Sequence, residues 1–256
     1  MKGRVLVTGA ALRVGRAIAE TLAASGYRIA IHYRSSAQEA EALAAALNTK
    51  YGQGWAITAK ADLAKDAETA ALIPDVVAAH GPLTGLVNSA SVFEDDRIES
   101  VNRAHWEKHL TTNLFAPVIL SQAFAAQLPP DANGSIVNIV DQGVLKLTPQ
   151  FFSYTVSKTG LWTVTQTMAQ GLAPRIRVNA VGPGPTLASI HQDAKGFAAQ
   201  VASTPLQRPS TPEDIAAAVV YLMGAQAVTG TMIPVDSGQR LNWRTADVAL
   251  TKSEAP

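Results

Sequence analysis

The chain has 256 residues, of which 47% are apolar and 16% charged, with a net charge of +1 and no cysteine. This composition can bury a large core, and the near-neutral charge without a basic run argues against a nucleic-acid partner. The lack of cysteine excludes thiol chemistry, disulfides and cysteine–zinc sites, and is compatible with a reducing cytosol, where we expect the protein.

The hydrophobic segments are short throughout the chain. The N-terminal run MKGRVLVTGAA is too short for a signal peptide and leads directly into a predicted strand. No segment approaches the ~20 apolar residues that a membrane helix needs, so we expect no membrane partner.

Apolar, β-branched runs alternate with stretches in which apolar residues recur at helical spacing. The first kind predicts strands over 2–8, 28–32, 55–59, 83–88, 134–140, 176–181 and 231–235. The second kind predicts helices over 14–25, 37–47, 67–79, 101–127, 153–171 and 212–223. We expect a bend in the long helix near Pro117, and a start of the last helix with Thr211 as cap and Pro212 in the first turn.

Alternating strands and helices with short connections predict an α/β fold, in which helices cover both faces of a parallel sheet. No linker or repeat divides the chain. We therefore expect one doubly wound domain over residues 1–256, with a weakly patterned tail from about 239 to 256.

The turn after the first predicted strand reads T-G-A-A-L-R-V-G, residues 8–15. Gly9 permits a tight turn, and Gly15 lets the next helix begin close to a ligand whose phosphates would face the helix N-terminus. Arg13 stands where a further glycine would be common. Two glycines near a helix start are weak evidence by themselves, and a purely structural turn is the alternative.

The second predicted strand ends in His32-Tyr33-Arg34-Ser35. It lacks the acid that holds the ribose 2′-hydroxyl in dinucleotide folds that prefer NAD. Arg34, the serines and His32 offer donors to a 2′-phosphate instead, and Arg13 could approach the same group. We therefore predict NADPH rather than NADH, the alternative being that Arg34 is a solvated loop residue.

Two further polar residues end predicted strands. Asp62 follows the third strand, where a carboxylate can accept from the adenine amino group. Asn88 ends the fourth, where the loop would meet the nicotinamide ribose of a bound dinucleotide.

Tyr154 and Lys158 are four residues apart, so on a helix they share one face, and Asp141 ends the preceding predicted strand. A phenol titrates near pH ~10. A cation beside it favours the phenolate, which makes the tyrosine a usable proton donor near neutrality. Taken alone, the pair could be a chance surface arrangement.

Over about residues 3–240 the chain resembles the short-chain dehydrogenase/reductase family. The resemblance rests on the T-G-x-x-x-R-x-G turn, the Asn88 loop, Asn113, Tyr154-x-x-x-Lys158, and the runs G-P-G at 182–184 and V-D-S-G at 235–238. It implies a Rossmann domain with a seven-stranded sheet, usually tetrameric or dimeric, and we expect a homotetramer. It also implies that Tyr154 is the general acid, that Lys158 holds the nicotinamide ribose and lowers the tyrosine pKa, and that Asn113 holds a relay water.

Three departures from the common family pattern resemble its pteridine reductase branch: Arg13, Ser89-Ala90-Ser91, and Asp141 in place of a serine. In that branch an aromatic ring at the position of Phe93 and the nicotinamide sandwich the flat pterin. Asp141 can accept from ring amino groups, or pass a proton with Tyr154 to a ring nitrogen. If ionised it would raise the Tyr154 pKa against Lys158, so we expect the two acids to titrate together.

The region after Gly184 is expected to form a mobile lid of one helix flanked by prolines, with Leu187 facing the substrate. From these positions and the resemblance, the expected site residues fall into three groups. The catalytic residues are Tyr154, Lys158, Asp141 and Asn113, and the substrate-binding residues are Ser91, Phe93, Asp141, Tyr154 and Leu187. The cofactor-binding residues are Gly9, Arg13, Val14, Gly15, His32, Tyr33, Arg34, Ser35, Asp62, Leu63, Asn88, Ser89, Ala90, Lys158, Pro183 and Gly184.

The leading hypothesis is an NADPH-dependent reductase that converts a small molecule, a dihydropterin or dihydrofolate, to its tetrahydro form. A reductase of ketones or 3-oxoacyl thioesters is the first alternative, against which Asp141 argues, since a carboxylate repels a developing oxyanion. A non-catalytic NADP-binding sensor is the second, against which the intact Tyr154 and Lys158 argue. No metal is expected, because His80, His105, His109 and His191 have no paired ligands.

Overall fold

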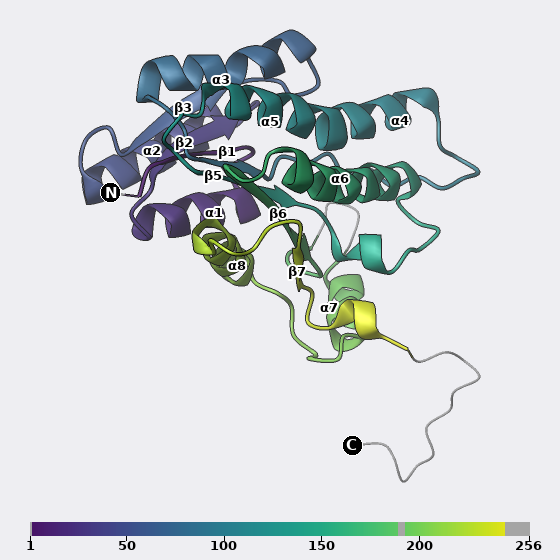
Figure 1. Cartoon of the computed structure of the whole chain (residues 1–256). Helices are drawn as coiled ribbons and strands as arrows, with labels where there is room; N and C mark the ends of the chain where they lie inside the picture. Colours follow the sequence, from purple (N-terminus) through teal and green to yellow (C-terminus); the bar gives the residue numbers. More distant parts are fainter. Residues whose placement is uncertain (1, 189–192, 244–256) are drawn as a thin grey trace.

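The computed structural model describes residues 2–188 and 193–243 (Figure 1). Seven parallel strands form one sheet in the order β3-β2-β1-β4-β5-β6-β7. The strands are β1 (Arg4–Val7), β2 (Arg28–Tyr33), β3 (Ala56–Lys60), β4 (Gly85–Asn88), β5 (Gly134–Ile139), β6 (Ile176–Pro183) and β7 (Met232–Val235). The strand order reverses between β1 and β4, and the carboxyl ends of strands beside such a point form the ligand crevice of doubly wound folds. The predicted α/β fold is confirmed.

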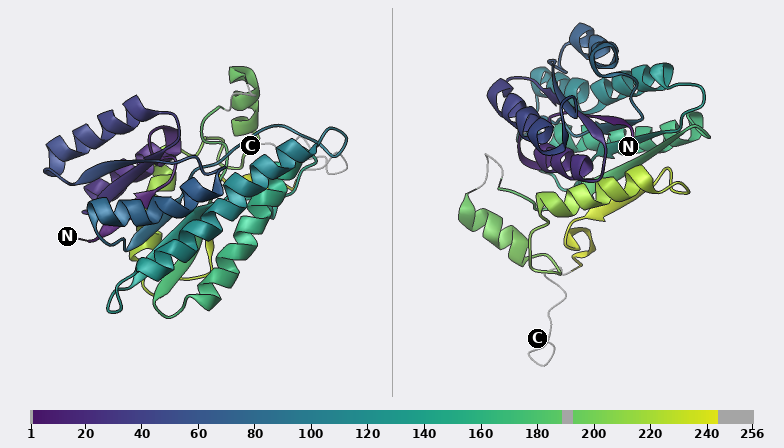
Figure 2. Two further views of the ribbon diagram at one scale, coloured as in Figure 1. Left: turned by 90° about the horizontal axis from the view of Figure 1, so that it is seen from above. Right: turned by 90° about the vertical axis from the view of Figure 1, so that its left-hand side faces the viewer.

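Helices cover both faces of the sheet (Figures 1 and 2). One face carries α1 (Arg13–Ala24), α2 (Ala37–Tyr51) and α8 (Pro212–Gly224), and the other carries α3 (Asp66–His80), α5 (Ala116–Gln127) and α6 (Phe152–Gly171). Because neighbouring residues of a strand point to opposite faces, Val5 and Val7 pack in the first layer and Leu6 in the second. Each strand therefore contributes to two cores.

The predicted long helix 101–127 is two helices joined by a wide turn. Helix α4 (Arg103–Leu110) leads into a π-helical turn, Thr111–Phe115, before α5 begins. Pro117 follows this turn and has no N–H to give to the Asn113 carbonyl, so a regular ladder of hydrogen bonds cannot run through it. The wide turn lies just before Pro117, where a bend was expected, and the buried Asn113 within it lies against the loop after β4.

Helix α8 begins as predicted. The Thr211 hydroxyl accepts from the Asp214 N–H, the Asp214 carboxylate accepts from the Thr211 N–H, and Pro212 occupies the first turn. A helix expected after Gly184 is also present, as α7 (Ala194–Ala202). Ser189 and His191, which belong to the expected lid, and the tail beyond 243 lie outside the described residues. Within those described ranges, no helix combines the length and apolar character needed to cross a membrane.

Candidate active site

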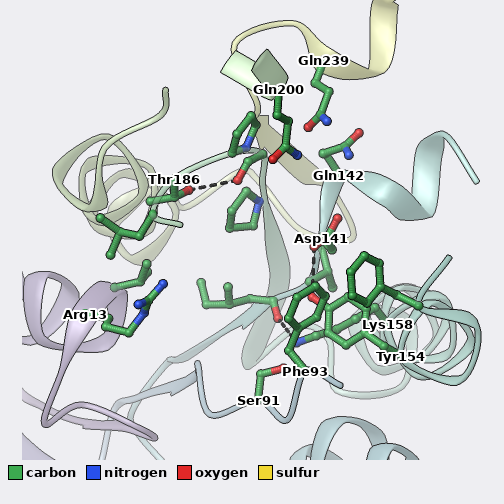
Figure 3. Close-up of a pocket in the computed structure, with 18 of the residues that line it drawn as sticks. Arg13, Ser91, Phe93, Asp141, Gln142, Tyr154, Lys158, Thr186, Gln200 and Gln239 are labelled. Atoms are coloured by element: carbon green, nitrogen blue, oxygen red, sulfur yellow. Dashed lines mark hydrogen bonds between the residues drawn. The ribbon is translucent and has the colours of Figure 1, made fainter. Parts of the chain in front are cut away.

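Two adjoining cavities open at the carboxyl ends of the strands. The smaller, about 530 Å³, is bordered by the turn after β1 and by the ends of β2 and β3. The larger, about 760 Å³, is bordered by the ends of β5 and β6 and by α6 and α7 (Figure 3). Arg13, Val14, Ser89, Ser91 and Phe93 line both. One continuous crevice therefore connects the predicted cofactor residues with the predicted proton donor.

The glycine turn has the compact geometry that its sequence predicts. Gly9 has a φ of 65°, in the left-handed region that glycine adopts at little cost. A Cβ on Gly15 would lie 2.1 Å from the Gly9 carbonyl oxygen, so only glycine lets α1 begin this close to the turn. Arg13 also has a positive φ of 52°, and its guanidinium donates to the Ala188 carbonyl at 3.2 Å, joining the turn to the segment after β6.

His32 supports the turn and is not a phosphate ligand. Its Nδ1 accepts from the Gly9 N–H at 3.0 Å, and its Nε2–H donates to the Ala61 carbonyl at 3.1 Å. Burial lowers the pKa of His32 to about 4, so the ring is neutral at physiological pH. Although His32 lines the smaller cavity, both ring nitrogens are engaged inside the protein. The expectation that it donates to a 2′-phosphate is therefore wrong.

The other predicted cofactor residues at the end of β2 and β3 border the smaller cavity. Arg34 is exposed and, within the described residues, makes no hydrogen bond or ion pair. Tyr33, Ser35, Asp62 and Leu63 also line this cavity. Because β2 and β3 are neighbours in the sheet, Arg34 and Asp62 border the same end of this cavity.

Thr8 is a residue that the sequence interpretation missed. Its hydroxyl oxygen accepts from the N–H groups of Ser89 at 2.9 Å and Ala90 at 3.0 Å, and thereby holds the loop after β4 against the turn after β1. Asn88 lines neither cavity. Its amide donates to the Asn138 side chain on the neighbouring strand β5 at 2.8 Å, so it fixes the residue from which this loop begins. The position of Thr8 could have indicated this role, since it follows β1 directly before Gly9 and β4 is the neighbouring strand in the sheet.

Tyr154, Asp141 and Lys158 converge on one wall of the larger cavity (Figure 3). The Tyr154 hydroxyl donates to the Asp141 carboxylate at 3.0 Å. The second Asp141 oxygen accepts from the Gly143 N–H at 2.7 Å, so Asp141 also caps the short helical turn that follows β5. The Lys158 ammonium donates to the Ile139 carbonyl at 2.9 Å and lies 5.7 Å from the centre of the Tyr154 ring.

The three groups shift one another's protonation. Burial raises the pKa of Tyr154 well above its usual value, and the charge and hydrogen bond of Asp141 raise it further. Burial also raises the pKa of Asp141, against the opposing effects of Gly143, Tyr154 and Lys158. Burial lowers the pKa of Lys158 to about 8. The resemblance implied that Lys158 lowers the Tyr154 pKa, but in this structure the pKa is raised. The reasons are burial and the Asp141 carboxylate, which contacts the hydroxyl, whereas the Lys158 ammonium lies over the ring.

Aromatic rings form one side of the larger cavity. Phe93 stacks on Phe151 with ring centres 4.4 Å apart, and Tyr154 meets Phe93 edge-on with centres 4.7 Å apart. Phe93 is half-buried and lines the cavity, so it is not an ordinary core residue. Phe151 was not foreseen, and nothing in its local sequence distinguishes it from a core residue at a helix start. The arrangement offers an apolar slot to a flat ring.

Asn113 lies beneath this slot rather than in it. Its side-chain oxygen accepts from the Val92 N–H at 2.8 Å, and its amide donates to the Val92 carbonyl at 2.9 Å and to the Ser157 hydroxyl at 3.1 Å. Ser91 donates to the same oxygen at 3.3 Å. The Asn113 side chain therefore fixes the substrate loop, and any contact with a relay water falls to its backbone carbonyl.

The wall opposite the aromatic slot comes from the segment after β6, α7 and the end of the described chain. Pro183 and Gly184, which were predicted to bind the cofactor, and Leu187, which was predicted to face the substrate, line this wall. Sequence reasoning missed further residues of the cavity lining: Phe197, Gln150, and the labelled residues Thr186, Gln142, Gln200 and Gln239 of Figure 3. Gln142 and Gln150 come from the connection between β5 and α6, Gln200 from α7 and Gln239 from the segment after β7, so no local pattern could have grouped all four glutamines.

Comparison with known proteins supports the resemblance to the short-chain dehydrogenase/reductase family. The profile of the family described as enoyl-(acyl carrier protein) reductase matches residues 9–240. An uncharacterised oxidoreductase of Methylorubrum extorquens is 34% identical, covering 94% of this chain and 99% of that protein. A 3-oxoacyl-[acyl-carrier-protein] reductase of Staphylococcus epidermidis is 32% identical, covering 93% and 99%.

Two solved structures are more similar. FolM alternative dihydrofolate reductase 1 from Brucella canis, complexed with NADP, is 45% identical with a TM-score of 0.92, covering 96% of this chain and 97% of that one. The Brucella suis protein of the same name, also in complex with NADP, is 45% identical with a TM-score of 0.93, covering 96% and 98%. With the fold, the glycine turn and the Tyr154–Lys158 pair, these matches establish that the chain belongs to the short-chain dehydrogenase/reductase family.

Proposed function

We propose that this protein is an NADPH-dependent reductase that converts a dihydropterin or dihydrofolate to its tetrahydro form. The observation that carries the proposal is the Asp141 carboxylate, bound by Tyr154 at 3.0 Å beside the Phe93 ring. A pteridine edge presents amino and ring N–H donors, which a carboxylate can accept. A carbonyl being reduced develops an oxyanion, which needs donors instead. The 45% identity to FolM alternative dihydrofolate reductases supports the same substrate class.

The smaller cavity fits a dinucleotide phosphate chain. Gly9 and Gly15 leave room for close backbone approach, and the start of α1 turns free N–H groups and a positive dipole end to the cavity. We assign the 2′-phosphate to Arg34, Ser35 and Arg13, with Tyr33 beside them, and the adenine to Asp62 and Leu63. The nicotinamide end goes to Ser89, Ala90, Lys158, Pro183 and Gly184, with Val14 along the phosphates, and Asn88 supports this loop from within the sheet. When bound, NADPH supplies a hydride.

The chain's own residues would supply the proton and the orientation. Tyr154 and Asp141 together hold a proton at the cavity wall, since burial raises the pKa of both acids. We assign to this pair the transfer of that proton to a ring nitrogen, while the adjacent ring carbon receives the hydride and the C=N bond becomes CH–NH. Lys158 offsets the negative charge that remains. The Asn113 carbonyl, which Pro117 cannot reach with an N–H, is our assignment for a water that restores the proton.

The aromatic slot would hold the flat ring. Phe93 offers its face, Ser91 a hydroxyl at the edge, and Leu187 an apolar contact from the opposite wall. Apolar faces with a few polar groups at the rim are the usual design of sites for small planar ligands.

We further propose that the chain forms one cytoplasmic domain that assembles as a homotetramer. An apolar hollow of about 300 Å³ between α5 and α6, lined by Val118, Met168 and Leu172 among others, supports an interface along these helices. Light scattering of the purified protein tests the assembly, and a monomer at micromolar concentration would contradict it.

The function is tested by following NADPH oxidation with dihydrobiopterin, dihydromonapterin, dihydrofolate and several ketones. We expect turnover on at least one of the three pteridines and little on ketones. Tyr154→Phe should lower kcat by about 10²–10⁴-fold, the usual contribution of a general acid. Activity on ketones alone would refute the pteridine proposal, and tight NADPH binding without any turnover would favour a sensor.

A further inference from the structure

A buried chain of polar groups lies behind the aromatic slot and touches neither cavity. It consists of His109 on α4, Ser153 at the start of α6, and Asp96 on the loop after β4, all at most 2% exposed. His109 Nδ1 and the Ser153 hydroxyl are 2.7 Å apart, and the Ser153 hydroxyl donates to an Asp96 oxygen. The other Asp96 oxygen accepts from the Ser153 N–H at 3.0 Å.

Only one arrangement of protons satisfies this chain. The Glu94 N–H can only donate, and it points at His109 Nε2 at 3.2 Å, so Nε2 accepts and the ring proton resides on Nδ1. Nδ1–H then donates to the Ser153 oxygen, and the Ser153 proton is left for Asp96. The tautomer is assigned from these partners. The direction of every hydrogen bond therefore depends on an acceptor at Asp96.

These buried polar groups connect the loop that carries Phe93 with the helix that carries Tyr154. Glu94 and Asp96 flank the loop segment that follows Phe93, and Ser153 directly precedes Tyr154. On the other side of Phe93, Val92 is held by Asn113. Phe93 is thus fixed from both sides. Asp96 caps the N-terminus of α6, because the side chain of the N-cap residue Phe151 has no hydrogen-bonding group.

We propose that His109, Ser153 and Asp96 are positioning residues that set the position of Phe93 relative to Tyr154, and with it the aromatic wall of the larger cavity on which the substrate ring would pack. They touch no substrate and act through the loop and the helix. The test below uses a pteridine as substrate, and this choice rests on the proposed function.

The sharpest variant is Asp96→Asn, which keeps the shape but places an amide donor at one of the two acceptor positions. We expect the KM for the best pteridine to rise about tenfold or more, with the KM for NADPH changed less than twofold. Ser153→Ala, which removes the link, should behave alike. Ile73→Val, a core change in α3 far from the slot, is the control for lost stability and should leave both KM values unchanged.

Two variants of His109 separate its hydrogen bond with Glu94 from its hydrogen bond with Ser153. His109→Gln retains an acceptor for Glu94 and His109→Asn retains a donor for Ser153, so each should raise the pteridine KM less than Ser153→Ala does. A second proton on His109 would face the Glu94 N–H, so the wild-type pteridine KM should also rise in acid, and this rise should vanish in His109→Gln. The charged or titratable groups around the ring are Asp96, Glu94, His105, Lys108 and Tyr154.

An unchanged pteridine KM in Asp96→Asn, or equal rises for pteridine and NADPH, would overturn the positioning role. A wild-type enzyme that reduces no pteridine would refute the proposed function instead. The positioning role is then decided by crystal structures of wild type and Asp96→Asn, which need no substrate. It requires a shifted Phe93–Tyr154 pair, and an unchanged 4.7 Å separation of the ring centres would refute it.

Discussion

At the scale of single residues, Asp141 determines which chemistry the site favours. Its carboxylate binds the Tyr154 hydroxyl at 3.0 Å and caps the turn after β5, so it is held in place from two sides. The sequence predicted its approach to Tyr154, because a strand end and a helix face meet there. It did not predict the direction in which the Tyr154 pKa shifts, since that depends on whether the Asp141 carboxylate or the Lys158 ammonium contacts the hydroxyl.

Lys158 makes the alkaline limit of activity predictable. Its pKa is lowered to about 8 by burial, so the ammonium is present below that pH and is lost as the pH rises through it. We expect kcat/KM for NADPH, which reports the free enzyme if NADPH binds first, to fall above pH about 8. Lys158→Arg keeps its charge, so any residual activity should lack this limb. A wild-type profile that is flat to pH 10 would contradict the role of the ammonium.

Arg34 is the residue on which the cofactor preference depends. Arg34→Asp should weaken NADPH binding about 10- to 100-fold, the range expected for a lost hydrogen bond to a charged group, and NADH binding hardly at all. Fluorescence titration with both cofactors measures this. Arg16→Asp is the control for charge reversal, since Arg16 lies on α1 and pairs with Glu20. Equal losses for NADPH and NADH would show that Arg34 does not bind the 2′-phosphate.

At the scale of elements, the end of β2 supports the turn after β1 through a neutral histidine. His32 has a folded pKa of about 4 against an ordinary 6.5, so the unfolded chain binds more protons between these values. Stability is therefore fully present above pH about 6.5 and is lost as the pH falls toward 4.

This linkage should cost about 2 kcal/mol of unfolding free energy between pH 7 and pH 5, by the two pKa values and the linkage relation. Urea denaturation at both pH values measures the loss. His32→Gln should reduce the difference between pH 7 and pH 5 by about that amount, although it will be less stable at pH 7. An undiminished pH dependence in the variant would show that His32 is not the responsible group.

At the scale of the whole molecule, the two cavities form one crevice, so cofactor binding should stabilise the entire fold. A ligand at 100 times its Kd adds ~2.7 kcal/mol to the unfolding free energy. For a chain of this length that corresponds to a rise in Tm of roughly 5–10 °C. Differential scanning fluorimetry should show this rise with NADPH and a much smaller one with equal NADH. The same rise in Arg34→Asp would contradict the assigned phosphate contact.

The sequence by itself determined the order and kind of the elements and the chemistry at the strand ends. Periodicity identified seven strands and the helices between them, because side chains on a strand or an amphipathic helix repeat with a fixed local period. Gly9, Gly15, Asp141, Tyr154 and Lys158 were recognisable because each belongs to a short motif whose spacing matters locally.

Only the tertiary structure decided how side chains from distant segments share their hydrogen-bonding groups. It engaged one nitrogen of His32 with the turn after β1 and the other with the end of β3. It also committed the Asn113 side chain to the substrate loop, and joined Asp96, His109 and Ser153 behind the slot. Those partners lie up to 57 positions apart along the chain, so no local period relates them. Burial then forces each polar group to find a partner, and the fold alone determines which partner is within reach.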